Sequence, residues 1–240
     1  MNIFKKIFFL FFPQFKKSDF YVEELREKGV HIGQGTHFFG PAKTEVDVQR
    51  PWMLNIGEYC KFASGVKILT HDYSRSVLRR YSGDIIGESG KTIIGNNVFV
   101  GMDSIILMGT HIGDNVVIGA GSVVKGVIES NSVYAGNPAK KICTLEEFYN
   151  KRANQQLEEA VLYFKSFVEN YNREPTISEM GPFWWMFLPR REESVLQEKV
   201  FTALSGDCED EVIESFLKSK PIFEDYKKFK EYVFANQVDD

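Results

Sequence analysis

Apolar residues recur at every sixth position along the middle of the chain. A small or β-branched residue usually stands four places after each of them. A helix would space its apolar residues by three and four and a strand by two, so a period of six fits neither. It predicts a coil in which three hexads close one turn and stacked turns pair their short strands about 4.8 Å apart. The repeating residues are Ile56, Phe62, Ile68, Ile94, Val100, Ile106, Ile112, Ile118 and Val124.

Glycine often follows the apolar residue directly, as at Gly57 and Gly95. We expect these glycines to accept corner dihedral angles that are costly for other residues. Ile32, followed by Gly33, resembles an earlier and isolated member of the series. Residues 72–91 interrupt the repeat, and the hexads on either side do not share one register of six. The sequence therefore predicts a loop that projects from the coil, where insertions often build the functional face.

The flanking regions have helical patterns. Residues 18–29 predict a short helix that caps the coil and ends at Gly29. The boundaries that we expect are an N-terminal helical segment at 1–30, the coil domain at 31–143 and a helical C-terminal region at 144–240. In that last region capping boxes begin at Thr144 and Thr176. Further short helices are predicted at 193–204, 209–218 and 222–234.

An aromatic cluster follows the second capping box. It contains Phe183, Trp184, Trp185 and Phe187. Such a cluster is usually the core of a small helical domain, although a surface for stacking a glycan or binding a partner is an alternative.

Composition and charge narrow the function classes. The chain has 240 residues and a formal net charge of −4, without the clustered basic surface that DNA or RNA binding requires. The three cysteines, Cys60, Cys143 and Cys208, form no disulfide framework or metal pair, which favours a reducing compartment. We therefore expect a cytoplasmic protein that does not bind nucleic acid.

The first 17 residues contain the one stretch that suggests a membrane. Its uninterrupted apolar run, residues 7–12, spans six residues and is flanked by lysines. That run is too short to cross a bilayer or to act as a signal peptide. It could make weak contact with the inner face of the membrane, or it could pack its phenylalanines on this or a neighbouring subunit.

Three segments carry a resemblance to a known family. They are residues 95–101 (GNNVFVG), 118–124 (IGAGSVV) and 135–140 (AGNPAK). As a set they resemble the hexapeptide-repeat acetyltransferases, which include sugar, polysaccharide and antibiotic acetyltransferases. The resemblance implies a left-handed parallel β-helix, a homotrimer and acetyl-CoA as co-substrate. We expect direct transfer in a ternary complex, because no cysteine or serine stands with a histidine in a recognisable nucleophile motif.

An alcohol is a poor nucleophile near neutral pH, so acetyl transfer to a hydroxyl needs a base. Histidine suits this task because its ordinary pKa is close to 6.5. Of the four histidines, His71 lies in the last hexad before the projecting loop, where the resembling enzymes carry their base. His71 is therefore the predicted general base. Its orienting partner stays open between a backbone carbonyl and the carboxylates of Asp72, Asp84 and Glu88.

The resemblance also implies a binding site for acetyl-CoA. Phosphate contacts are expected from the lysines after the turn at Asn137, and the pantetheine arm is expected along the backbone of the coil. Phe99 would wall the pocket at a place where relatives often carry tryptophan. No metal is expected, because the three converging histidines of a zinc site are missing from the sequence. The predicted co-substrate residues are Phe99, Gly101, Met102, Ala120, Lys125, Lys140 and Lys141.

These features predict an O-acetyltransferase that acts on a saccharide hydroxyl of the capsule or lipopolysaccharide type. Two alternatives remain. The acceptor could instead be an antibiotic hydroxyl or the amine of a nucleotide amino-sugar. The coil could also be a non-catalytic scaffold, which would bind no acetyl-CoA.

Overall fold

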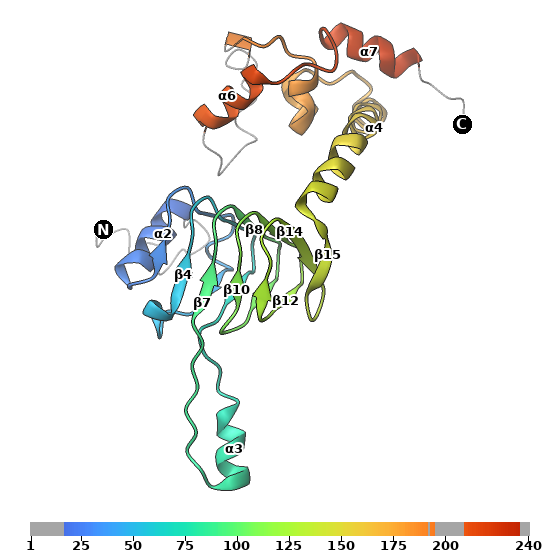
Figure 1. Cartoon of the computed structure of the whole chain (residues 1–240). Helices are drawn as coiled ribbons and strands as arrows, with labels where there is room; N and C mark the ends of the chain where they lie inside the picture. Colours follow the sequence, from blue (N-terminus) through green and yellow to red (C-terminus); the bar gives the residue numbers. More distant parts are fainter. Residues whose placement is uncertain (1–16, 192, 195–208, 236–240) are drawn as a thin grey trace. The chain divides into compact units, whose positions relative to one another are not determined.

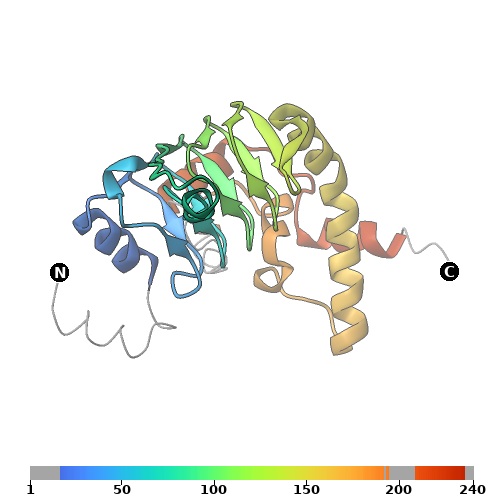
Figure 2. The same ribbon diagram turned by 90° about the horizontal axis from the view of Figure 1, so that it is seen from below.

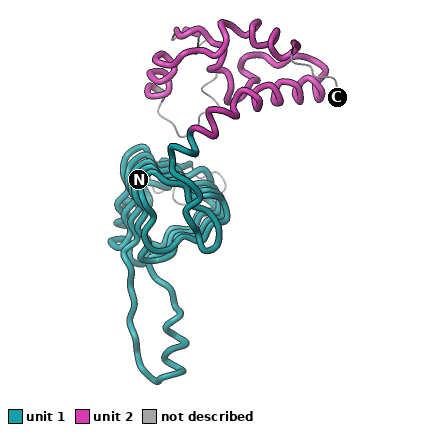
Figure 3. The backbone as a smooth tube through the Cα atoms, turned by 45° about the vertical axis from the view of Figure 1, so that its right-hand side comes forward, with its two compact units in different colours: residues 1–149 teal, residues 150–240 magenta. Residues whose placement is uncertain are grey.

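The computed structural model describes residues 17–191, 193, 194 and 209–235. The proposed membrane contact of residues 1–17, most of the helix expected at 193–204, and Cys208 lie outside the described residues. Among the described helices none is both long enough and apolar enough to cross a bilayer. Two compact units divide the chain, residues 1–149 and 150–240 (Figure 3).

The first unit is a left-handed parallel β-helix, as the resemblance implied (Figure 1). Short strands stack into three sheets, and each of the four complete coils contributes one strand to each sheet. The first sheet contains β1 (His31–Ile32), β4 (Leu54–Ile56), β7 (Thr92–Ile94), β10 (His111–Ile112) and β13 (Val127–Ile128). The second contains β2 (His37–Phe38), β5 (Lys61–Phe62), β8 (Val98–Val100), β11 (Val116–Ile118), β14 (Ser132–Ala135) and β15 (Lys140–Thr144). The third contains β3 (Glu45–Val46), β6 (Lys67–Ile68), β9 (Ile105–Ile106) and β12 (Val123–Val124).

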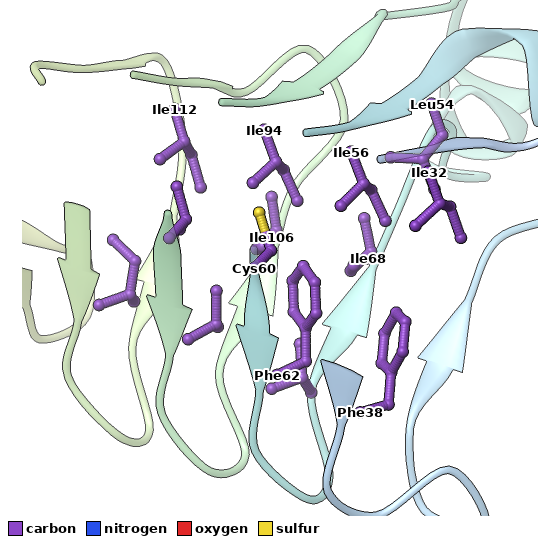
Figure 4. Close-up of a cluster of buried hydrophobic side chains, with 14 of the residues drawn as sticks. Ile32, Phe38, Leu54, Ile56, Cys60, Phe62, Ile68, Ile94, Ile106 and Ile112 are labelled. Atoms are coloured by element: carbon purple, nitrogen blue, oxygen red, sulfur yellow. The ribbon is translucent and has the colours of Figure 1, made fainter. Parts of the chain in front are cut away.

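The repeat of six is confirmed as the inward-facing series of the coil. Ile56, Ile94 and Ile112 stack along one sheet, while Phe38, Phe62 and Val100 stack along another (Figure 4). All of them are at most 3% exposed. Regular coils place stacked residues 18 positions apart, as at Asn97 and Asn115, whereas the coil with the insertion separates Glu58 from Asn96 by 38. The insertion therefore leaves the stacking register of the flanking coils intact.

Buried hydroxyls line the corners of the coil and satisfy its backbone. The Ser104 and Ser122 hydroxyls both donate to the carbonyl of Gly119, at 3.0 and 2.6 Å. Thr92 donates to the Leu69 carbonyl at 2.7 Å. These three side chains are completely buried, so each hydroxyl needs such a partner.

The expected reason for the repeated glycines is wrong. Gly57 and Gly95 have no positive φ; instead, a Cβ at Gly57 would lie 2.4 Å from the Gly95 carbonyl oxygen of the next coil. Glycine is needed there because stacked backbones approach closely. The left-handed corner positions fall partly on asparagines: Asn97 and Asn115 have φ of 53° and 55°, and their amides hydrogen-bond at 2.9 Å.

Helix α2 (Ser18–Glu27) covers the first coil, as predicted. Its Tyr21 ring packs edge-on against Phe38 with 5.1 Å between centroids, and its hydroxyl donates to the Thr44 carbonyl at 3.1 Å. The Ser18 hydroxyl accepts from the Phe38 amide at 2.9 Å. The helix thereby closes an end of the apolar core that would otherwise face water. A single 3-10 turn, η2 (Pro51–Met53), precedes β4.

The insertion at 72–91 forms an arm that projects from the coil, with helix α3 (Arg75–Ser82) at its far end (Figure 1). Figure 2 views this helix end-on, and the arm extends away from the sheets. No residue of α3 is buried, and Tyr81 and Ile85 are 89% and 91% exposed. The projecting loop was predicted, but its helix was not.

After β15, which runs antiparallel to β14, helix α4 (Leu145–Tyr171) begins with the predicted capping box. The Glu147 amide donates to the Thr144 hydroxyl at 3.1 Å, and the Thr144 amide donates to the Glu147 carboxylate at 2.7 Å. The second box is confirmed in the same way at Thr176 and Glu179, before η3 (Ser178–Met186).

The second unit has its own apolar core. Helices α6 (Glu209–Lys218) and α7 (Tyr226–Ala235) contribute to it. The first matches the predicted 209–218, whereas the helix expected from 222 begins later, since the Ile222 and Phe223 amides bind the Met186 carbonyl. Trp184 and Phe187 are 4% and 1% exposed, so the aromatic cluster is mainly core.

Candidate active site

His71 and Asp47 form a close hydrogen-bonded pair of side chains on the coil. The His71 Nδ1 lies 2.5 Å from Asp47 Oδ2, although the two residues are 24 positions apart in the sequence. The Asp47 side chain is 6% exposed and that of His71 is 22% exposed. The nearly buried Asp47 carboxylate is therefore hydrogen-bonded to the His71 imidazole, which solvent and a substrate can reach.

The stacking of the third sheet explains this proximity. Val46 of β3 pairs with Ile68 of β6, and the Asp47 amide donates to the Ile68 carbonyl at 2.9 Å. Both strands then end, so the residues that follow them meet at the same corner. Thr70, completely buried there, donates its amide and hydroxyl to Asp47 Oδ2 at 3.0 and 2.5 Å.

Hydrogen bonding determines the charge state of Asp47. Burial acts to raise the pKa of this carboxyl, but the hydrogen bonds from Thr70, Gln49 and His71 outweigh it and hold the pKa below the ordinary value of 3.8. Asp47 is therefore ionised near neutral pH. An ionised acceptor at Nδ1 favours the imidazole tautomer with its proton on Nδ1, which leaves the Nε2 lone pair available as a base.

Asp47 was not predicted from the sequence as the orienting partner of His71, whereas three other carboxylates were. Asp72 Oδ1 accepts from the Ser74 amide and hydroxyl at 2.8 and 2.7 Å, so it orders the start of the arm. Asp84 is exposed on the arm, and Glu88 lies near its base, where its carbonyl accepts from Arg50 at 2.8 Å. The expectation that one of these carboxylates, or a backbone carbonyl, orients His71 Nδ1 is therefore wrong.

The other histidines lie elsewhere on the coil. His31 and His111 are exposed on the first sheet, and His37 lies in the second, with its ring 4.7 Å from that of Phe39.

Several of the predicted co-substrate residues lie along the corner where the chain enters the third sheet. The Gly121 amide donates to the Met102 carbonyl at 2.7 Å, and a Cβ at Gly101 would lie 2.5 Å from the Ala120 amide nitrogen. Met102 is 55% exposed, and Ala120 is also exposed. This corner therefore presents exposed small and flexible side chains over closely stacked backbone.

Phe99 and the predicted lysines lie at other points of the coil. Phe99 is 41% exposed on β8, in the second sheet. Lys125 follows β12 and leaves the third sheet at the same edge as His71. Lys140 begins β15, while the ammonium of Lys141 is paired with the Glu129 carboxylate at 2.6 Å. Lys140 is exposed, and no acidic side chain in the described part of the chain pairs with it.

Four of the predicted site residues thus fall on two edges of the narrow third sheet. His71 and Lys125 follow its strands, whereas Met102 and Ala120 precede them. The structure brings Gly101, Met102 and Ala120 together, and it brings His71 together with Asp47. In the described ranges no group of three or more His, Cys, Asp or Glu side chains could hold a metal ion.

Residues 91–125 match the family model described as the hexapeptide repeat of succinyl-transferase. Protein CapG of Staphylococcus aureus is 35% identical over 171 residues, which cover 67% of this chain and 98% of that protein. The chain belongs to the hexapeptide-repeat acetyltransferases.

Members of the family with named roles are also similar over shorter stretches. WbbJ of Escherichia coli (strain K12), assigned to lipopolysaccharide biosynthesis as an O-acetyl transferase, is 51% identical over 55 residues, or 23% of this chain and 28% of that protein. The solved structure of a maltose O-acetyltransferase from Clostridium difficile 630 is 30% identical. It covers 51% of this chain and 73% of that one, with a TM-score of 0.36. As a member of this family the chain is an acetyltransferase, and the scaffold alternative is set aside.

Proposed function

We propose that this protein transfers an acetyl group from acetyl-CoA to a hydroxyl of a saccharide, with His71 as the general base and Asp47 as its orienting partner. The 2.5 Å contact between His71 Nδ1 and Asp47 Oδ2 is the observation that carries this proposal. It couples a base to a fixed anion at the edge of the arm, where an acceptor could approach from solvent.

The proton transfers follow from this geometry. His71 Nε2 takes the proton of the acceptor hydroxyl as its oxygen attacks the thioester carbonyl. The imidazolium that forms is stabilised by the Asp47 carboxylate through Nδ1–H. The carbon–sulfur bond then breaks, and Nε2 returns the proton to the thiolate of CoA. The products are the acetyl ester and free CoA, and no acyl-enzyme is required.

The residues around the coil suit acetyl-CoA. The corner of Gly101, Met102 and Ala120 presents an exposed small side chain at Ala120 and an exposed flexible one at Met102, which suits an extended chain lying against it. The exposed ammonium of Lys140 suits a phosphate as a point charge. Lys141 suits it less well, because Glu129 already occupies its ammonium and raises its pKa by hydrogen bonding.

A homotrimer would complete the site. His71 and the Met102 corner lie on opposite edges of one sheet, so an adjacent subunit could bring the base of one coil beside the co-substrate corner of the next. The arm supports the same proposal: Tyr81 and Ile85 are almost fully exposed, and an eight-residue helix without tertiary contacts is marginal in water. We propose that the arm packs on a second copy.

A saccharide acceptor is favoured by the similarity to WbbJ, which is assigned to lipopolysaccharide biosynthesis. An antibiotic hydroxyl and the amine of a nucleotide amino-sugar are the competing acceptors. The arm beside His71 would select among them.

The decisive experiment measures thiol release from acetyl-CoA with lipopolysaccharide and capsule oligosaccharides, nucleotide amino-sugars and chloramphenicol as acceptors. We expect release to depend on an oligosaccharide and to fall by about 10³-fold in His71→Ala, a loss typical of removing a catalytic base. His111→Ala is the matched control and should retain full activity. Release that survives in His71→Ala would exclude this base, and release with chloramphenicol alone would exclude the saccharide.

A further inference from the structure

A groove of about 630 Å3 runs along one face of helix α4 in the second unit. Its α4 residues are spaced by three and four, so they form a single stripe over three turns, roughly 18 Å long. The groove is open to solvent along its length and is closed on one side by Phe183 of η3. It is lined by Glu159, Leu162, Tyr163, Ser166, Phe167, Asn170, Tyr171 and Phe183.

Four aromatic rings form most of its surface. Phe167 and Tyr171 lie 4.5 Å apart, and Tyr163 meets Phe183 edge-on at 5.7 Å. Tyr171 is 64% exposed even though it is a large ring on a helix with a packed core behind it. Ala160 and Phe164 of α4 are buried in the core of this unit, and Phe183 packs against that core at the edge of the groove. Tyr171 lies outside the core cluster, so its exposed ring is not needed to hold the helix in place.

Polar groups are interleaved with these rings. Asn170 donates its amide to the Ser166 carbonyl at 2.7 Å, which fixes the side chain and leaves its oxygen as an acceptor. At one end the Glu159 carboxylate is held by Arg152 through two bonds of 2.7 and 2.6 Å. At the other end Arg173 stacks 5.0 Å above Phe167 while it is paired with Glu179. The charges at both ends are thus neutralised and fixed.

This combination fits a sugar chain better than an apolar helix. The C–H faces of a pyranose carry partial positive charge and stack on the electron-rich faces of aromatic rings, while its hydroxyls need amide and carboxylate partners at the edges. A helix seated here would bury the side-chain oxygen of Asn170 without a donor, whereas a sugar hydroxyl could donate to it. The volume is within the range of ligand sites, and the open, elongated shape suits several linked sugar units.

We propose that this groove binds an oligosaccharide stretch of the polymer that carries the acetylated hydroxyl, as a second saccharide site separate from His71. The inference rests on the proposed function for the identity of the polymer. It adds that the second unit holds acceptor chains and raises their effective concentration at the coil. Longer acceptors should therefore be used better than short ones.

The test uses the full chain in a His71→Ala background, so that binding is measured without turnover. The probes are an array of bacterial capsule and lipopolysaccharide oligosaccharides together with maltoheptaose and chitohexaose. Tyr171→Ala is the groove variant, and Tyr149→Ala is the matched control, because Tyr149 is 68% exposed on the same helix and outside the groove. We expect binding to at least one glycan, weakened about tenfold by Tyr171→Ala and unchanged by Tyr149→Ala.

The same substitutions in the active enzyme separate this inference from the proposed function. Tyr171→Ala should raise the KM for a long acceptor and leave kcat and the KM for a monosaccharide unchanged. Glycan binding without any acetyl transfer would support the groove as a glycan site and would contradict the proposed function. The inference would be overturned if no glycan of the array bound, or if both variants lost binding equally. It would also be overturned if Tyr171→Ala dissociated the oligomer, because the groove would then be a subunit interface.

Discussion

Thr70 places both its amide and its hydroxyl on the same oxygen of Asp47 that receives His71 Nδ1. Thr70 is completely buried, and its backbone continues directly into His71. Thr70, the residue next to the base, therefore fixes the Asp47 carboxylate independently of its hydrogen bond with the His71 imidazole. A dyad built in this way has little freedom to lose during the reaction.

Replacing Asp47 by Asn should keep the shape of the corner and remove the charge. An amide at this position no longer selects the Nδ1–H tautomer or stabilises an imidazolium, so we expect kcat to fall by roughly 10²- to 10⁴-fold. Steady-state thiol release measures this effect. Asp72→Asn is the control and should stay within about threefold of wild type, because the Asp72 side chain hydrogen-bonds to Ser74 and Glu88 of the arm. Equal losses in the two variants would contradict the dyad.

The depressed pKa of Asp47 makes a prediction for stability against pH. Because the folded pKa lies below the ordinary 3.8, the ionised carboxylate stabilises the fold fully above that value, and this contribution disappears as pH falls through the folded pKa. We expect the difference in the free energy of unfolding between His71→Ala and the double variant with Asp47→Asn to be constant from about pH 8 to pH 5 and to shrink below pH 4. Urea titrations measure this difference, and one that grew on acidification would refute the assignment.

Gly57 and Gly87 make a matched pair for the close stacking of the coils. A Cβ at Gly57 would lie 2.4 Å from the backbone of the next coil, whereas one at Gly87 meets nothing within 4 Å. Gly57→Ala should lower the free energy of unfolding by about 2 kcal/mol through overpacking. Gly87→Ala should change it by less than about 0.5 kcal/mol. Thermal or urea unfolding compares the two, and a neutral Gly57→Ala would mean that the coils can separate at little cost.

Lys140 and Lys141 should differ in their contribution to acetyl-CoA binding. Lys140→Ala should raise the KM for acetyl-CoA by roughly three- to tenfold and leave kcat unchanged, and the effect should weaken at high salt. Lys141→Ala should change KM less, because Glu129 already pairs with its ammonium. Initial rates at varied acetyl-CoA measure both effects, and the reverse order would move the phosphate site to Lys141.

Tyr81 and Ile85 test the arm as an intersubunit contact. The double change Tyr81→Ser, Ile85→Ser removes apolar area that nothing in the described part of this subunit covers, so the fold of the single chain should be unaffected. We expect the oligomer to dissociate at a higher protein concentration, as measured by sedimentation. Ile222→Ser, at 42% exposure in the second unit, is the control. An unchanged oligomer with normal activity would show that the arm makes no contact with another subunit that the oligomer requires.

The sequence alone predicted the coil because its rule is local. A period of six fixes which side chain faces inward at Ile94, Val100 and Ile106, and each coil repeats the same environment. The capping boxes at Thr144 and Thr176 were equally readable, since both of their hydrogen bonds join residues three positions apart. His71 was found by its place at the last hexad before the insertion.

Only the tertiary structure revealed Asp47 and the true reason for the glycines. Asp47 belongs to the first coil, where the repeat of six is lost after Phe38, so no spacing in the sequence connects it to His71. The stacking of β3 on β6 brings the two together. Gly57 is required by the backbone of a coil 38 residues further along, across the arm. The groove on α4 also depends on tertiary structure, because core packing decides which rings of a helical stripe are buried. In each case the contact joins segments that are far apart in the sequence. The lengths of the coils and loops set this sequence separation, and local residue patterns do not encode it.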